Sequence, residues 1–587
     1  MKPNKIKFLF ITISLLTLGA CKKILEEQPR SLLTPEFFAT PGGIEGGVAF
    51  GYSDLRNLWG TENFNNYTEG GTDEVLAGGS NNNTYLFTYS SLLGTNSNDF
   101  GALWNVCYEI INTENGVLKF GPSANVPAAT KAQLLAQAKF LRAFCYFHLV
   151  ETFGDIPLHL DFINTQSAAD SRQPIADVYA AIIKDLTEAA ADLPNLPVAN
   201  TGKPAYKATA LYLLAKTYLT RGWSTAAKSD DFQNAYATAN SIITNKATYG
   251  LGLWANYGDA NRKGNEYGQE TIMVIDHNND TKYGEYTLNS AASGNKENKS
   301  NFYYRPNYPT VNANYPAAGG NPVIDRDILN GRPFIRIRPN YAYSIQVAFA
   351  DKINDYRYDR TFQTHWIANR TGSNATTTPR GTLVAGVDTA IWMPDRIVTA
   401  AERNAFKGII FEPPIAGATT PYTAIIFPSM RKYDDSPRAF LNDASTRPFI
   451  LFKFSEVYLI AAEAAFKMND NPSAAAMLNV IRQRAAFRPT NTPAQNAAAV
   501  LAQTITPAQV TLAFILDERT RELYGEYMRW WDLVRTKTLV SRIQQYNPEA
   551  AAGIQPFHVL RPIPQSQIDL VTEGSCIGKT CWQNPGY

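Results

Sequence analysis

The sequence predicts a mostly α-helical protein, in which paired helices form a scaffold and a large loop-rich subdomain is inserted between them. Two observations support this prediction. Apolar residues recur at steps of three, four and seven in several stretches before residue 250 and after residue 448, which is the period of a helix with one buried face. Between these stretches, residues 250–448 are rich in Gly, Asn, Pro and Tyr and show few helical periods.

The first residues have the composition of an export signal. Three lysines precede the apolar run of residues 8–18, and Leu-Gly-Ala leads directly into Cys21. A charged start, a short apolar core and a small-residue cleavage site are typical of a signal peptide. The run is too short for a membrane-spanning helix, which needs about 20 residues.

Leu-Gly-Ala-Cys resembles a bacterial lipobox, so we expect removal of residues 1–20 and lipidation of Cys21. The lipid would be the only membrane attachment, because no second segment is long and apolar enough to span a bilayer. An ordinary secretory signal followed by a chance cysteine is the alternative.

Helical periods recur in pairs along the rest of the chain. We expect helices at residues 101–119, 130–151, 174–191, 204–221, 450–468, 472–486 and 506–536. Two of them open at a proline, Pro174 or Pro204, which suits the first helical turn. The arrangement is similar to degenerate tetratricopeptide repeats, although the spacings exceed the usual period of about 34 residues.

These patterns divide the chain into four segments. They are the signal peptide (1–20), an N-terminal lobe of tetratricopeptide-like helix pairs (21–249), an inserted loop-rich ligand-binding subdomain (250–448) and C-terminal helices that complete the scaffold (449–587). Within the insert, short runs such as residues 271–275 and 423–427 have a strand pattern. Because loops on rigid scaffolds commonly carry recognition, we expect much of the function in the insert.

The stretch of residues 518–535 combines an apolar face with many charges. Its charged residues stand three apart, as in Glu518 and Arg521 or Asp532 and Arg535, so they can pair along a helix. Exposed pairs contribute only about 0.3–0.5 kcal/mol each. So many charges beside two tryptophans indicate that some are partly buried and lock one helix against another. A catalytic pair of carboxylates is the alternative.

Composition excludes several classes of protein. The chain has 54 Lys and Arg against 52 Asp and Glu, and loss of three lysines with the signal peptide leaves 51 against 52. A near-neutral protein lacks the basic excess that nucleic-acid binding requires. Five histidines without ligand spacing argue against a metal enzyme. Nothing in the sequence requires a cofactor.

Five cysteines are too few for a disulfide scaffold in an exported chain of 587 residues. Cys107 and Cys145 stand in apolar helical patterns and are expected to be buried thiols. Cys576 and Cys581 lie close together near the C-terminus. In an oxidising compartment, we expect them to form a disulfide that closes a small loop.

Motifs spread over nearly the whole chain point to one family. In chain order they are Thr72-Asp73-Glu74, residues 138–144 (AKFLRAF), Gly154-Asp155-Ile156-Pro157, residues 454–464, residues 478–485 (LNVIRQRA), residues 518–535, Pro562-Ile563-Pro564 and the final QNPGY. Together with the lipobox, they resemble the SusD/RagB family of nutrient-binding outer-membrane lipoproteins. Tyr527 stands where that family more often has Gly, which is a small departure.

The resemblance implies a surface-exposed, lipid-anchored protein of the outer membrane that binds a nutrient and sits as a lid on a TonB-dependent transporter. It implies a binding protein, with no catalytic residues. The expected ligand is an oligosaccharide or polysaccharide. The alternatives are the same scaffold binding peptides or another nutrient, a glycoside-acting enzyme, or a pure protein-interaction scaffold.

Aromatic residues make up 12% of the chain and gather in non-helical stretches. Sugar rings stack on aromatic faces, while their hydroxyl groups need polar partners such as Asn and Asp. Because the family builds its ligand face from equivalent loops, we expect two groups far apart in sequence to hold the ligand: Asp73, Tyr85 and Tyr89, and Tyr283, Tyr303 and Tyr304. The alternative is that most of these rings pack the loops.

Overall fold

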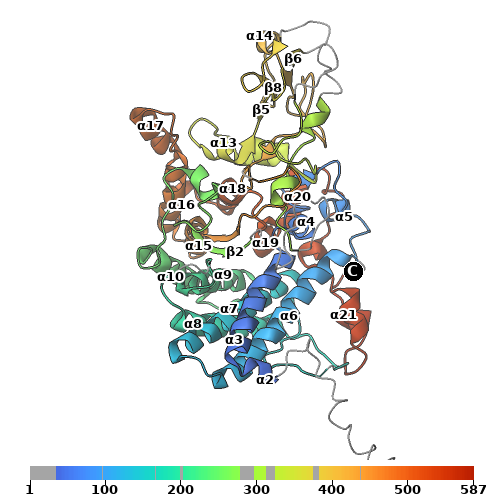
Figure 1. The fold of residues 1–587 in the computed structure, drawn as a ribbon, viewed down its shortest axis with the longest axis vertical. Helices are drawn as coiled ribbons and strands as arrows, with labels where there is room; N and C mark the ends of the chain where they lie inside the picture. Colours follow the sequence, from blue (N-terminus) through green and yellow to red (C-terminus); the bar gives the residue numbers. More distant parts are fainter. Residues whose placement is uncertain are drawn as a thin grey trace, which may run out of the picture.

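The fold is described from a computed structural model. It covers residues 35–95, 97–165, 167–198, 202–277, 296–311, 324–373, 382–436 and 438–587. Helices from both ends of the chain form one body, and the middle of the chain extends from its upper end in the view of Figure 1. The predicted fold class, a mostly helical scaffold with a loop-rich insert, is confirmed. The expected signal peptide and the expected lipidation site, Cys21, lie outside the described residues.

The helices before residue 250 include a stack in which consecutive helices are neighbours. They are α2 (Pro35–Phe38), α3 (Pro41–Asp54), α4 (Glu62–Glu69), α5 (Thr84–Thr88), α6 (Asn98–Phe120), α7 (Ala128–Phe153), α8 (Ile175–Asp192), α9 (Lys207–Trp223) and α10 (Asp231–Thr244). α7 packs against both α6 and α8, and α9 packs against both α8 and α10. Ala138, Ala143 and Ala210 are completely buried, so their small side chains let neighbouring backbones approach closely.

The C-terminal helices continue this stack. They are α15 (Phe454–Lys467), α16 (Asn471–Ala485), α17 (Pro493–Gln503), α18 (Leu512–Leu523), α19 (Arg529–Arg535), α20 (Leu539–Tyr546), α21 (Gln565–Leu570) and α22 (Lys579–Trp582). α15 packs against α10 and α16. It begins later than predicted, because strand β11 (Phe449–Lys453) precedes it and pairs antiparallel with β2 (Thr271–Ile275).

The middle of the chain consists of short elements joined by loops. They are α11 (Ser300–Tyr303), β3 (Ile337–Pro339), a π-helical turn (Tyr341–Ala348), α13 (Arg357–Thr361), β4 (Phe362–Gln363), β5 (His365–Ile367), β6 (Gly372–Ser373), β7 (Thr382–Leu383), β8 (Thr389–Trp392), α14 (Ala400–Ala405), β9 (Ile409–Ile410) and β10 (Ser429–Met430). β5, β8 and β9 form a three-stranded sheet near the top of Figure 1.

The strand predicted at residues 423–427 is wrong, because this segment is a loop. The hydroxyl of Thr423 accepts hydrogen bonds from the backbone N–H groups of Ile425 and Ile426, at 3.2 and 3.0 Å. A side chain that binds its own backbone in this way turns the chain and competes with strand pairing.

The single helix predicted over residues 506–536 is also wrong, because a turn separates α18 from α19. Gly525 has φ +69° and Tyr527 has φ +65°, and left-handed residues end a helix. A Cβ atom on Gly525 would also lie 2.7 Å from Sδ of Met430, so a larger residue would have to displace this side chain as well as adopt a left-handed backbone.

The charges of α18 and α19 are buried ion pairs, as the sequence indicates. Glu518–Arg521 and Asp532–Arg535 are both present, each at 2.7 Å. Arg519 contacts a glutamate of α15, also at 2.7 Å. The interpretation that these charges lock helices together is therefore confirmed.

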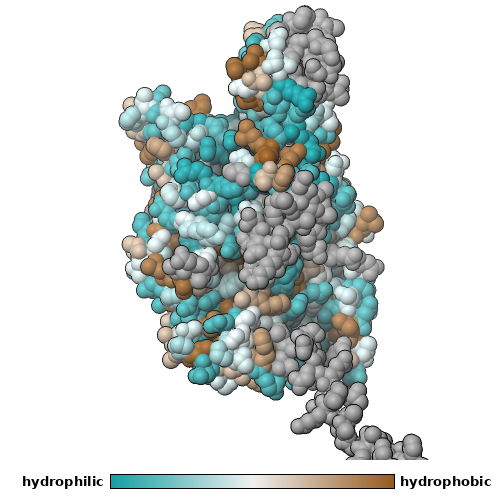
Figure 2. Space-filling view, in the orientation of Figure 1, coloured by the Kyte–Doolittle hydropathy of each residue, from teal (hydrophilic) through white to brown (hydrophobic). Residues whose placement is uncertain are grey.

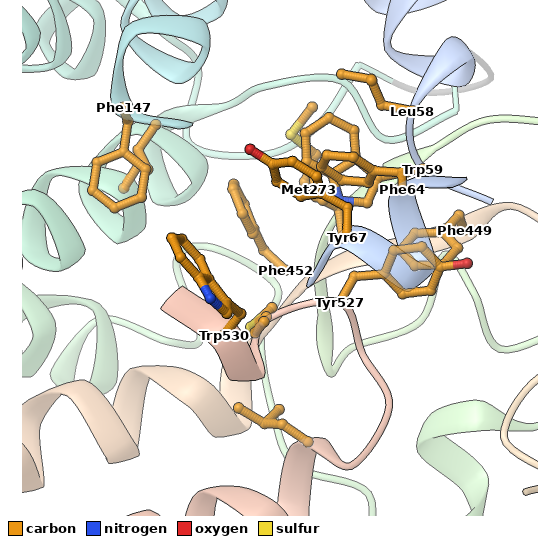
Figure 3. Close-up of a cluster of buried hydrophobic side chains, with 14 of the residues drawn as sticks. Leu58, Trp59, Phe64, Tyr67, Phe147, Met273, Phe449, Phe452, Tyr527 and Trp530 are labelled. Carbon is orange, nitrogen blue, oxygen red and sulfur yellow. The ribbon is translucent and has the colours of Figure 1, made fainter. Parts of the chain in front are cut away.

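Aromatic rings fill the interior between the N-terminal lobe and α19. Trp59 meets Phe64 with ring centroids 4.7 Å apart, and Tyr527 meets Phe449 at 4.8 Å. Figure 3 shows these rings together with Trp530 of α19. The scaffold and the middle of the chain therefore share one core.

The surface shown in Figure 2 is largely hydrophilic, with hydrophobic residues in small scattered groups. None of the described helices is both long and apolar enough to span a bilayer.

Candidate ligand-binding cleft

A cleft of about 1030 Å³ lies where the loop after β1 (Val75–Ala77) meets the segment before β3. Its lining residues come from the turn before α4 and α4 itself, from α6, from residues 80–83, from residues 297–303 and from residues 326–336. This volume is at the upper end of the range of ligand pockets. The cleft therefore has room for an extended ligand.

Antiparallel pairing of β1 with β3 sets one wall of the cleft. The backbone N–H of Gly78 donates to the carbonyl of Arg336 at 2.8 Å, and that of Ser80 donates to Ile335 at 3.1 Å. Asn81 Nδ2 also donates to the carbonyl of Arg336, at 2.8 Å. A Cβ atom on Gly78 would lie 2.2 Å from the carbonyl oxygen of Ile335, so glycine permits this close approach.

Residues around α11 form a second wall. The backbone N–H of Lys299 and the hydroxyl of Tyr303 both donate to the carbonyl of Gly60, at 3.0 and 3.1 Å. The N–H of Arg336 in turn donates to the carbonyl of Tyr303 at 3.0 Å. Three segments that are distant in sequence therefore meet at fixed positions.

Phe334 is the half-exposed aromatic ring of the lining. The other aromatic lining residues, Phe64 and Tyr303, are buried. The guanidinium groups of Arg332 and Arg336 lie 4.8 and 5.5 Å from the centroid of the Phe334 ring, within the range of cation–π contacts. This ring and its cationic neighbours offer an apolar face beside hydrogen-bond donors.

Two carboxylates of the lining are held by cations. Glu62 pairs with Arg336 at 2.7 Å, and Glu297 pairs with Lys299 at 3.0 Å. Each carboxylate thus already has a cationic partner in the lining. The arrangement suits binding better than acid–base catalysis, in which two carboxyl groups act directly on a substrate.

Asp73 and Tyr89, both predicted as ligand contacts, are instead part of the interior. Asp73 is completely buried and pairs with Arg529 at 2.7 Å and with Arg542. Burial alone would raise the pKa of its carboxyl, but the two arginines hold it below its usual value. The hydroxyl of Tyr89 donates to the carbonyl of Gly71 at 2.9 Å. Neither side chain can reach a ligand on the surface, which corrects these predictions.

The other predicted tyrosines lie in different environments. Tyr304 is buried and donates to Asn65 Oδ1 at 2.9 Å, so its prediction is corrected too. Tyr303 forms part of the cleft lining but is 2% exposed, and it presents no open ring face. Tyr85 is half-buried on α5 and is not part of the lining. Tyr283 lies outside the described residues.

The structure does bring together the two predicted regions, but with other side chains. Sequence reasoning missed Phe334, Arg332 and Arg336, although a signal was present. From Phe334 to Arg338, buried Ile335 and Ile337 alternate with half-exposed residues, which is the two-faced pattern of a strand. Phe334 and Arg336, two of the half-exposed residues in this alternation, both line the cleft.

Among the described residues, two cysteines form a disulfide and two are free thiols. Cys576 and Cys581 are joined in a disulfide, and Trp582 Nε1 donates to the carbonyl of Cys576 at 3.0 Å. Cys107 and Cys145 are free and buried.

In the part of the chain that the structure describes, no His, Cys, Asp and Glu side chains form a group that could hold a metal ion.

Two family models match the chain. Residues 199–587 match the model described as the SusD family, and residues 61–219 match one described as starch-binding and associating with the outer membrane. The SusD-like protein P25 of Formosa agariphila is 24% identical over 587 residues, which cover 97% of this chain and 96% of that protein. The SusD-like protein P2 of the same organism is 32% identical over 286 residues, 47% of this chain and 53% of that protein; the match thus spans about half of its length.

Solved structures share the fold. A SusD homolog from Bacteroides thetaiotaomicron superposes with a TM-score of 0.67 at 19% identity, over 94% of this chain and 98% of that one. A laminarin-binding SusD-like protein superposes with a TM-score of 0.62 at 20% identity, over 93% and 99%. Surface glycan-binding protein A from Bacteroides thetaiotaomicron, solved with laminarihexaose, gives 0.62 at 19% identity, over 93% and 99%.

Proposed function

Since this chain belongs to the SusD family, we propose that it binds a nutrient glycan at the bacterial surface and delivers it to a TonB-dependent transporter of the outer membrane. It acts by binding, without catalysis. The observation that carries this proposal is the cleft beside Phe334, which combines a half-exposed ring with guanidinium and amide donors. Sugars offer apolar ring faces and hydroxyl groups, and both find partners there.

The similar proteins support a glycan as the ligand. One structure of this fold is a laminarin-binding protein, and another contains laminarihexaose. The family model that matches residues 61–219 describes starch binding. Their shared ligand class is carbohydrate, and the cleft here is large enough for several sugar rings.

The proposal also includes a lipid anchor at Cys21 and a transporter partner. Cys21, the last residue of the lipobox-like motif, carries the lipid that holds the domain on the outer membrane. Labelling with a palmitate analogue should mark the wild type and spare Cys21→Ala. Pull-down from native membranes should recover a large β-barrel protein. Equal labelling of both proteins contradicts the anchor, and a pull-down without a barrel contradicts the transporter partner.

A glycan array, followed by calorimetry on each positive glycan, tests the binding itself. We expect dissociation constants of about micromolar to millimolar, because a protein that passes on its cargo must also release it. A peptide library serves as the counter-screen. Binding of peptides but of no glycan would replace the proposed ligand class, and hydrolysis of a bound glycan would contradict the absence of catalysis.

A further inference from the structure

Charge is unevenly distributed over the cleft. Among the described residues, its charged lining consists of four cations and two carboxylates: Lys299, Arg326, Arg332, Arg336, Glu62 and Glu297. The carboxylates neutralise Arg336 and Lys299, as the ion pairs above show. Arg326 and Arg332 have no carboxylate partner, so the described lining has a net charge of about +2. All 587 residues of the chain together carry the same net charge, +2. Positive charge is therefore concentrated in this cleft.

Arg326 has acidic neighbours in sequence, but both have other partners. Asp325 pairs with Arg370. Asp327 Oδ1 accepts from the backbone N–H of Asn330 at 2.6 Å, and its Oδ2 accepts from Asn369 at 2.6 Å. Arg326 itself is exposed and makes a long hydrogen bond of 3.4 Å to an asparagine oxygen. Among the described residues, no carboxylate neutralises it.

Arg332 is half-buried, and its guanidinium lies over the ring of Phe334. It has no ion pair with any carboxylate that the structure describes. Burial, and then the charge of Arg326, lower the pKa of Arg332. Two like charges that line one cleft repel each other in a partly desolvated wall, and a bound anion would relieve this repulsion.

We propose that the cleft binds an anionic glycan, whose carboxylate or sulfate groups contact Arg332 and Arg326. This inference rests on the proposed glycan-binding function and names the chemical class of the glycan. The planar guanidinium group donates two parallel hydrogen bonds to such an anion. Phe334, next to Arg332, then packs against the sugar ring that carries the acidic group, while Asn82 at the rim donates to hydroxyl groups.

Affinity electrophoresis with three polysaccharides tests the proposal. Polygalacturonate carries carboxylates, ι-carrageenan carries sulfates, and laminarin is neutral. The wild type is compared with Arg332→Gln and Arg326→Gln. Arg396→Gln is the matched control, because it removes the same charge from an exposed arginine that is not part of the lining.

We expect retardation of the wild type by an anionic polysaccharide, with an affinity that falls as salt rises. Arg332→Gln should weaken this affinity about tenfold or more, since hydrogen bonds between charged groups are strong. Arg326→Gln should weaken it too, and Arg396→Gln should not. Binding to polygalacturonate alone identifies carboxylates as the recognised groups, and binding to ι-carrageenan alone identifies sulfates.

Three results would overturn the inference, and they differ in whether the proposed glycan-binding function survives. If laminarin binds, Phe334→Ala abolishes this binding and neither anionic polysaccharide binds, the glycan-binding function stands and the anionic class is wrong. If an anionic polysaccharide binds equally well to the wild type, Arg332→Gln and Arg326→Gln, its acidic groups are not recognised here. Failure of all three polysaccharides to bind counts against the proposed function itself, and the inference falls with it.

Discussion

Arg529 of α19 and Asp73 of the N-terminal lobe form a bidentate ion pair, with Nε 2.7 Å from Oδ1 and Nη2 2.8 Å from Oδ2. Both side chains are buried, and the pair joins positions 456 residues apart. Arg542 contacts the same carboxylate. The two ends of the scaffold are therefore held together by charges that are shielded from water.

Removal of Arg529 should be strongly destabilising. Arg529→Gln leaves a buried carboxylate with one fewer cation, so we expect the free energy of unfolding to fall by about 3–5 kcal/mol. Arg396→Gln, in an exposed pair with Glu402, should have far less effect because water replaces the lost partner. Urea unfolding followed by circular dichroism measures both, and equal effects would contradict a locking role for Arg529.

Glu151 should make stability depend on pH. It is buried beside Tyr179, whose hydroxyl donates to Oε1. Burial raises the pKa of this carboxyl from 4.5 to about 7, although Tyr179 and Arg535 lower it. Between these two values the folded protein keeps a proton that the unfolded chain has released, so this group favours folding most below pH 4.5 and loses that effect as pH rises to about 7.

Glu151→Gln removes this titration. Relative to wild type, the variant should gain roughly 2–3 kcal/mol of stability between about pH 5 and pH 8. Urea unfolding of both proteins at the two pH values isolates the effect, because all other titrations cancel in the difference. Glu573→Gln, at an exposed position, should show no such trend. A difference between Glu151→Gln and wild type that is constant with pH would refute the prediction.

The helices could be predicted because their signal is local. Residues 101–119 and 174–191 were expected as helices, and the structure has Asn98–Phe120 and Ile175–Asp192. The break after α18 escaped prediction because the apolar spacing continues through the turn. Tyr527 and Trp530 are both buried, so burial alone does not distinguish a continuous helix from two helices joined at Gly525.

The binding residues were harder to predict from the sequence, because an aromatic ring can either stack on a sugar or fill the core. The buried hydroxyl groups of Tyr304 and Tyr89 donate to Asn65 and Gly71, which are 239 and 18 positions away, and no local pattern reveals such contacts. Phe334 takes its place in the cleft through the pairing of β1 with β3. Non-local pairing therefore decides which rings reach solvent.

The disulfide near the C-terminus should act locally. Cys576 and Cys581 are 5 positions apart, and a small loop gains little from closure in the unfolded chain, so replacing both by Ser should cost about 1–2 kcal/mol. We expect a slightly lower melting temperature with unchanged ligand affinity. Mass spectrometry of unreduced wild-type protein checks the bond, and two free thiols would rule it out.

Substitutions at Phe334 and Tyr304 should have different effects, the first on glycan affinity and the second on the free energy of unfolding. Phe334→Ala removes the half-exposed ring of the cleft, so glycan affinity should fall about tenfold, the equivalent of roughly 1–2 kcal/mol of stacking and burial. Tyr304→Phe keeps its ring but loses the hydrogen bond to Asn65, so the free energy of unfolding should fall by about 1–2 kcal/mol with unchanged affinity. Calorimetry gives the affinities and urea unfolding gives the stabilities, each measured on both variants. The opposite pattern, with affinity lost in Tyr304→Phe and retained in Phe334→Ala, would move the site away from this cleft and towards the tyrosines that the sequence first indicated.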